Sequence, residues 1–278
     1  MLRAITDDGA FRVITALTTD TVRGAIESQA ARGATARTFG DLITGSILFR
    51  ETMAPDLRVQ GVLRTKATGS LVADSHPSGM TRGLVQMKSG AESISLAEGA
   101  VIQMMRTLPS GRINQGVVEV PENGGVSQAL MAYMQTSEQV VSMLAVGTVL
   151  DEHDRVVAAG GYMVQLLPEV GRGPLMVMTE RLRDYETIDE QLRDAQFSPA
   201  WLLEQLLYGM PFTRLDESSV AYDCWCDELR VMSALATLRR ADIEHLLSTN
   251  EVLEIACEYC KREYRIAPAR LRGLLEQS

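Results

Sequence analysis

The placement of the cysteines constrains this chain more than any other feature. All four lie in residues 224–278, as a C-x-C pair and a C-x-x-C pair separated by 30 residues. Two such thiol pairs, brought together by folding, supply the four tetrahedral ligands that Zn²⁺ prefers. No coordination position is then left for water, so the site would be structural and closed. The sequence therefore predicts zinc binding, against the alternative of buried or incidental cysteines, by Cys224, Cys226, Cys257 and Cys260.

The residues around the cysteines indicate how the two halves would meet. The C-x-x-C half is expected on a turn between strands at 252–256 and 264–266, and the C-x-C half on an extended segment whose alternate side chains share one side. A module of about 55 residues is near the lower limit for folding without a metal or disulfide. Loss of zinc is therefore expected to unfold it. Each neighbouring thiol pair is also placed to form a readily reduced disulfide once the metal leaves.

The first 170 residues mix strand and helix patterns without a repeat, which is typical of an α+β domain. Alternating or Gly-bounded apolar runs predict strands, and apolar residues at helical spacing predict a helix. Strands are expected at 56–64, 69–74 and 116–120, a helix within 125–147, and a strand pair at 156–167 interrupted by Gly160 and Gly161. The predicted core domain is 1–170.

A breaker cluster at 171–174 opens a charged segment with a mainly helical pattern. Its best-defined helix follows Ser198, which can cap it; Pro199 suits the first helical position and Gly209 the C′ position. The leucines of this helix form an apolar face that must pack on something. The sequence thus predicts a helical linker at 171–223 between the core and the four-cysteine module at 224–278.

Charge and hydropathy exclude several other classes. The net charge of −9 argues against broad attraction to nucleic acid or to anionic membrane. The longest uncharged run in the most apolar region, 139–150, is too short to span a bilayer. Asp7 and Asp8 stand where a secretory signal would be apolar. A cytoplasmic location is expected, where structural disulfides are disfavoured.

Motifs of common enzymes are missing from the sequence, which has no G-x-S-x-G elbow and no Walker loop. His76, His153 and His245 are far apart and are interpreted as surface or turn residues. We therefore expect no enzymatic activity. A zinc-ribbon adaptor for nucleic acid stays as the alternative function, because the tail at 261–272 is basic and Tyr259 and Tyr264 could stack on bases.

The cysteine segments resemble those of a known family. Residues 222–226, 256–260 and 264–265 are similar to the signature of the 33 kDa chaperonin family, also called heat-shock protein thirty-three. Supporting similarities in the core lie at 71–74, 81–83, 115–119, 137–139 and 158–168. The resemblance extends over essentially the whole chain.

The resemblance implies a redox-regulated holdase chaperone that works without ATP. Reduced members hold zinc through four thiolates and are inactive. Oxidation implies disulfides between Cys224 and Cys226 and between Cys257 and Cys260, with release of zinc and unfolding of the module and of the linker at 171–223. The oxidised protein is then expected to form a homodimer and to bind unfolding client proteins, preventing their aggregation.

Overall fold

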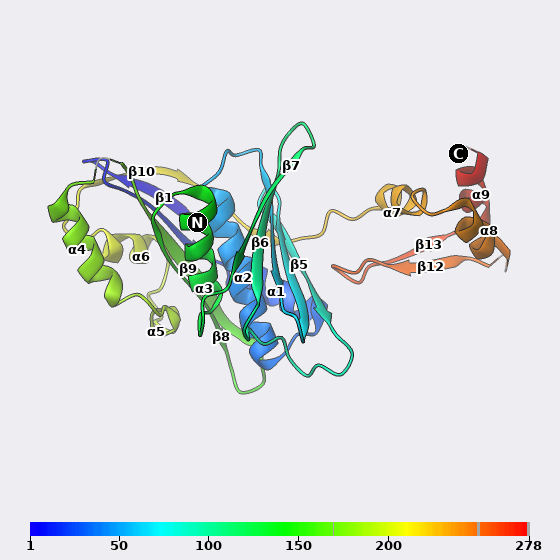
Figure 1. The fold of residues 1–278 in the computed structure, drawn as a ribbon, viewed down its shortest axis with the longest axis horizontal. Coiled ribbons are helices and arrows are strands. Elements are labelled where there is room, and N and C mark those ends of the chain that lie inside the picture. Colours follow the sequence, from blue (N-terminus) through cyan, green and yellow to red (C-terminus); the bar gives the residue numbers. More distant parts are fainter. Residues whose placement is uncertain (169, 249–250, 277–278) are drawn as a thin grey trace. The chain divides into compact units, whose positions relative to one another are not determined.

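Two sheets of mainly antiparallel strands, with helices between them, form the larger part of the protein (Figure 1). The computed structural model describes residues 1–168, 170–248 and 251–276. It divides into two units, Met1–Tyr222 and Asp223–Ser278. The two units are described separately below.

The first unit contains a five-stranded and a six-stranded sheet. The five-stranded sheet has the order β10-β1-β2-β9-β8, and the six-stranded sheet the order β11-β5-β4-β3-β6-β7. The strands of the first are Phe212–Glu217, Leu2–Thr6, Phe11–Leu17, Val156–Leu166 and Ser142–Leu150. Those of the second are Ala221–Tyr222, Met80–Met87, Gly69–Ser75, Arg58–Arg64, Val101–Thr107 and Ile113–Glu119.

Helices α1 (Thr19–Gln29), α2 (Gly33–Glu51) and α3 (Val126–Tyr133) pack in the main core. Helix α2 lies between the two sheets (Figure 1), and its buried residues run almost without a break from Phe39 to Glu51. A helix covered on all sides loses the one-sided pattern of a surface helix, and this explains why the sequence analysis did not predict α2.

Two local predictions in the core need correction. The helix expected within 125–147 is α3 with one π-helical turn, Met134–Glu138, and residues from Ser142 onward form β8. The strand pair expected at 156–167 is the single strand β9. Gly160 and Gly161 do not interrupt it. A Cβ at either position would lie within 2.6 Å of a backbone oxygen of a neighbouring strand, so the two glycines permit close strand approach.

The segment predicted as a helical linker begins with α4 (Arg172–Arg183), α5 (Asp189–Leu192) and α6 (Pro199–Leu206). They cover the outer face of the five-stranded sheet (Figure 1). Ser198 caps α6 as expected, because its Oγ accepts a hydrogen bond from the Trp201 N–H at 3.1 Å, and Pro199 is the first helical residue. Gly209 has a φ of +72° but lies one residue beyond C′, since Leu207 is the C-cap.

The last part of that segment contains two strands that the sequence did not predict, β10 and β11. β10 pairs antiparallel with β1, and β11 pairs parallel with β5. Residues 171–222 belong to the first of the two units. The three-part division at 1–170, 171–223 and 224–278 stays a prediction.

The second unit contains α7 (Glu228–Leu235), α8 (Arg240–Ser248), the hairpin strands β12 (Leu253–Ala256) and β13 (Glu263–Ile266), and α9 (Pro268–Glu276). The expected strands around the C-x-x-C motif are confirmed. The unit has a small apolar cluster, whose buried members are Met232, Leu235, Ile266 and Leu271. Within the described parts of the chain, no helix is both long and apolar enough to cross a membrane.

Candidate metal centre

The four cysteines meet at one point of the second unit. Their sulfur atoms all lie within 4.8 Å of one another. Two of the distances are 3.8 Å, from Cys224 Sγ to Cys257 Sγ, and 3.4 Å, from Cys226 Sγ to Cys260 Sγ. A tetrahedron with metal–sulfur bonds of about 2.3 Å has edges of about 3.8 Å. The arrangement therefore fits a tetrahedral metal with four thiolate ligands.

The turn between β12 and β13 fixes the C-x-x-C half. The Cys257 N–H donates to the Arg262 carbonyl at 2.9 Å, and the Cys257 carbonyl accepts from the Lys261 N–H at 2.8 Å. Lys261 has a φ of +61°, in the left-handed region that reverses the chain tightly. With both of its backbone groups bonded across the turn, Cys257 presents its sulfur from the same loop as Cys260.

Two aspartates fix the C-x-C half, which lies just before α7. The Asp223 carboxylate accepts a hydrogen bond from the Cys224 N–H at 2.7 Å. Asp227 is the N-cap of α7, and its carboxylate accepts from the Arg230 N–H at 2.7 Å. The segment holding Cys224 and Cys226 is thus bonded at both ends.

The hydroxyl of Tyr264 on β13 donates to Cys226 Sγ at 3.1 Å. Burial opposes ionisation of Cys226, but hydrogen bonds from Tyr264 and from the other thiols outweigh it and lower the pKa of Cys226 to about 7. Burial is the main cause that raises the pKa of Cys260 to about 12. The Tyr264 hydroxyl thus favours the thiolate form of Cys226.

Sequence reasoning missed this role of Tyr264, which it treated as packing or a base-stacking candidate. The hydrogen bond depends on the hairpin register, in which Tyr264 lies opposite Ile255 and beside the cysteine turn. A tyrosine four residues after the second cysteine of C-x-x-C is the only signal in the sequence that points to it.

The other titratable candidates do not form a second site. Asp74, near His76 in sequence, is buried and bound by Arg58, at 2.6 and 2.7 Å, and by Arg82, at 3.1 Å. His76 lies in a turn with Ser78, and His153 and His245 are exposed. Among the described residues, the four cysteines are the one group of His, Cys, Asp or Glu gathered closely enough to hold a metal.

Comparison with known proteins supports the family resemblance that was found in the sequence. The sequence pattern of the family described as Hsp33 protein matches residues 1–267. This chain belongs to the Hsp33 family. Two relatives named 33 kDa chaperonin, from Syntrophotalea carbinolica and Streptococcus sanguinis, are each 27% identical to this Hsp33, over 99% of its chain and 98% of theirs.

The fold is shared with a solved structure. The crystal structure of the 33 kDa chaperonin (heat shock protein 33 homolog) from Thermotoga maritima superposes on this Hsp33 with a TM-score of 0.82. The two chains are 19% identical, and the match covers 99% of this chain and 98% of the other. The resemblance found in the cysteine segments is therefore confirmed for the whole chain.

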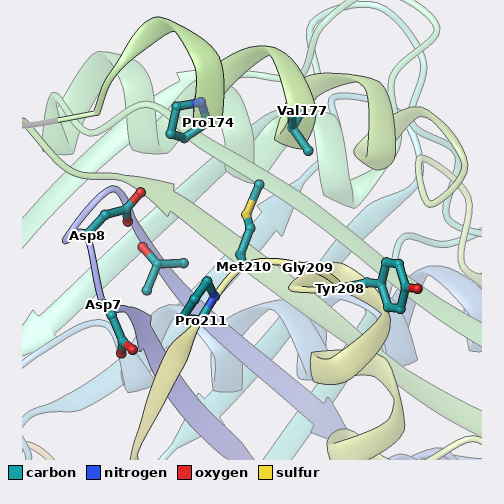
Figure 2. A pocket seen from close by; sticks show the side chains of 9 residues that line it. Asp7, Asp8, Pro174, Val177, Tyr208, Gly209, Met210 and Pro211 are labelled. Carbon is teal, nitrogen blue, oxygen red and sulfur yellow. The ribbon is translucent and has the colours of Figure 1, made fainter.

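The segment predicted as the linker packs on the five-stranded sheet through a shared apolar cluster. Buried leucines of α6, such as Leu202 and Leu206, share an apolar cluster with Leu2, Ala4 and Val13 of the five-stranded sheet. A pocket of ≈ 490 Å³ lies between helix α4, the loop after α6 and the turn between β1 and β2. Figure 2 shows Met210 reaching from the loop after α6 toward α4, with Asp7 and Asp8 of the β1–β2 turn at the other side.

Two further contacts hold the predicted linker against the core. Gly147 of β8 makes room for α5, because a Cβ there would lie 2.4 Å from Asp189 Oδ1. Gly24 of α1 makes room for Tyr222 of β11, because a Cβ there would lie 2.7 Å from the ring. The segment therefore fits against the core at two glycines, once at α5 and once near its C-terminal end.

Proposed function

We propose that this Hsp33 is a redox-regulated holdase chaperone that needs no ATP. When reduced, Cys224, Cys226, Cys257 and Cys260 would hold Zn²⁺, which supplies the cross-link that the small second unit lacks. The observation that carries the proposal is the convergence of four thiols in a unit with so small an apolar cluster. Such a unit depends on its metal, so chemistry at the thiols changes its folding.

Activation proceeds by oxidation of the thiols. Two thiols and one molecule of hydrogen peroxide give one disulfide and two molecules of water, so that two peroxides oxidise all four cysteines. We assign the disulfides to Cys224 with Cys226 and to Cys257 with Cys260. Sulfurs of different motifs are close in the folded unit, at 3.4 and 3.8 Å. Once the unit loosens, however, only partners two or three positions apart stay tethered together.

Unfolding of the second unit after zinc is lost is expected to release the linker at 171–223 from the core as well. Leu202, Leu203 and Leu206 of α6 are fully buried, so release of the helices uncovers apolar surface on both the linker and the core. That surface would bind unfolding clients and would favour a homodimer of the oxidised chain. We place this activity in the cytoplasm, where reduced thiols are the resting state.

The alternative of a zinc-ribbon adaptor for nucleic acid is not favoured. Arg265 and Arg270 of the basic tail form ion pairs with Glu254 and Glu228, at 2.8 and 3.2 Å. Tyr264 is bonded to the cysteine site through its hydroxyl. Three of the residues that would contact phosphate or stack on bases thus have partners within the unit. We propose neither a nucleic-acid partner nor an enzymatic activity.

The test is light scattering of a heat-unfolding client enzyme mixed with the protein. One sample is reduced and zinc-loaded, the other is treated with hydrogen peroxide under mild heat. We expect the oxidised sample alone to suppress aggregation. A matched variant with Ser233→Ala, away from the cysteines, should behave as the parent. Equal failure of the reduced and oxidised samples would contradict the proposal, and equal suppression would remove the redox control.

A further inference from the structure

Strand β10 closes one edge of the five-stranded sheet, and its own side chains hold it only weakly. It pairs with β1 from Leu2 opposite Glu217 to Thr6 opposite Phe212, with a bulge between Arg3 and Ala4. Five of its six side chains are exposed, and the sixth, Phe212, is half-buried. The strand is therefore attached chiefly by backbone hydrogen bonds, which any extended chain can form.

Phe212 packs half-buried against the apolar cluster of the five-stranded sheet, and the other side-chain contacts of β10 with the core are polar and lie at the surface. Arg3 pairs with Asp216 at 2.5 Å, and the Thr213 hydroxyl donates to Asp7 at 3.0 Å. Exposed contacts of this kind stabilise a structure little. They do not select strongly for the sequence of β10.

Strand β1, the neighbour of β10 in the sheet, has both the backbone edge that β10 covers and an apolar face. Leu2 and Ala4 are buried in the cluster that the linker helix α6 covers through Leu202, Leu203 and Leu206. Because β10 and α6 belong to one continuous segment, its release opens the edge of β1 and uncovers the adjacent apolar face together.

We propose that the β1 edge, once the segment at 171–222 undocks, takes an extended segment of an unfolding client as a new strand in place of β10. The proposal rests on the redox-controlled release described above and names where and how clients bind. Pairing through backbone groups is independent of sequence, as a holdase for many clients requires. Segments with alternating apolar residues are preferred, because alternate side chains of a strand lie on the face of Leu2 and Ala4.

Release of strand β11 would newly open only a two-residue stretch of the β5 edge. The strand pairs with β5 through only Ala221 and Tyr222, opposite Met80 and Thr81. A ladder of two residues is too short to hold a client strand. The β1 edge is therefore the one that we assign to clients.

The experiment measures hydrogen exchange of the β1 amides in the oxidised full-length chain. The probe is a synthetic peptide with the sequence of residues 211–218, and the control is the same peptide with alternate amides N-methylated, so that it cannot form a ladder. We expect oxidation to speed exchange at Leu2–Thr6, and the plain peptide or a bound client to restore protection. The plain peptide, and not the methylated one, should also compete with the client in light scattering.

A variant pair tests the edge without a peptide. Thr213→Pro with Arg214→Pro removes two adjacent backbone donors of β10, one of which faces β1 in an antiparallel ladder. The matched control, Thr213→Ala with Arg214→Ala, loses the same side chains and keeps the donors. We expect the proline variant alone to hold client at a lower peroxide dose than the parent.

The outcomes separate this proposal from the proposed function. Clients held while the β1 amides stay unprotected, or equal competition by both peptides, would overturn the proposal and leave the holdase intact. Protection of β1 that appears without client or peptide and grows with protein concentration would assign the edge to a second copy of the chain, again overturning it. If the oxidised chain holds no client, the holdase fails, and absence of peptide protection in that sample then rejects the edge as well.

Discussion

The hydroxyl group of Tyr264 contacts one of the four cysteines of the second unit. It lies 3.1 Å from Cys226 Sγ and donates a hydrogen bond to it. Hydrogen bonds to the sulfur of a metal ligand orient the ligand and stabilise its negative charge. Tyr264 therefore belongs to the metal site, although it cannot itself coordinate the ion.

Replacement of Tyr264 by Phe is expected to weaken metal retention. It removes the hydrogen bond and keeps the ring, so the affinity for Zn²⁺ should fall by roughly 10- to 100-fold. Competition with a chromophoric chelator measures the change. Tyr208→Phe serves as a control, because Tyr208 is 75% exposed in the first unit. Unchanged affinity in the Tyr264 variant would show that the hydroxyl has no part in the site.

At this scale the sequence analysis named the four cysteines that the structure gathers, but not the groups that form hydrogen bonds around them. Four cysteines at this spacing point to one site because few other arrangements bring thiols together. The hydrogen bond from Tyr264, the one accepted by Asp223 and the N-cap at Asp227 depend on the register of the β12–β13 hairpin and on where α7 begins. Those features follow from the folded backbone and leave only weak marks on the sequence.

Helix α5 brings a second carboxylate toward a buried one. Asp41 of α2 has an Oδ1 atom that is closed to solvent and has no hydrogen-bond partner among the described residues. Burial is the main cause that raises the pKa of Asp41 to about 7; the Asp189 carboxylate of α5 adds to the rise, whereas Thr148 and Arg37 oppose it. The protonation of Asp41 thus depends on the position of α5, which holds Asp189.

The contribution of Asp41 to the stability of the first unit is expected to fall as the pH rises from about 4 to about 7. In this window the folded chain keeps a proton on Asp41 that the unfolded chain has lost, so unfolding becomes easier by up to about 1.4 kcal/mol per pH unit. Denaturant unfolding at several pH values measures this slope. Asp41→Asn should flatten it, and the exposed Asp20→Asn should not; an unchanged slope in the Asp41 variant would contradict the assignment.

Docking of β11 depends on the space left by Gly24. A methyl group there would lie 2.7 Å from the ring of Tyr222, so Gly24→Ala must displace the ring or shift α1. We expect this variant to activate at a lower peroxide dose or temperature in the client-scattering assay. Gly173→Ala is the control within the linker, since a Cβ there meets no atom within 4 Å. Identical thresholds for both variants would show that Tyr222 does not retain the linker.

Elements were predictable where their pattern is one-sided, and less so elsewhere. Strand β3 has an alternating sequence, β4 begins at a glycine and helix α6 has a capping serine, and all three were predicted. Helix α2 is buried on nearly every side, and β10 is an edge strand with exposed, charged side chains, so neither shows a periodic signal. The role of β10 is visible only once its partner β1 is known.

At the scale of the molecule, the two units are expected to differ in their dependence on metal. The first unit has two large apolar clusters, whereas the second has one small cluster. A chelator under reducing conditions should therefore unfold the second unit while the first keeps its structure. If both units lost structure together on chelation without oxidation, the first unit would depend on the metal too.

The chain carries one tryptophan for each unit, which makes the measurement direct. Trp201 lies on α6 in the first unit and Trp225 lies between the cysteines of the second. In a Trp201→Phe variant, chelation should shift the fluorescence of Trp225. In the complementary Trp225→Phe variant, the fluorescence of Trp201 should change only when oxidation releases the linker.

The pairing of β1 with β10 also bears on how the protein is made. Arg3 and Asp216 are 213 positions apart, and ribosomes add about 5–20 residues per second. The first strand therefore leaves the ribosome roughly 10 to 40 s before the strand that covers its edge. During every round of translation the nascent chain carries that edge uncovered, without any oxidant. The edge of β1 is thus open to aggregation while this chain is being synthesised, and the late arrival of β10 ends that interval.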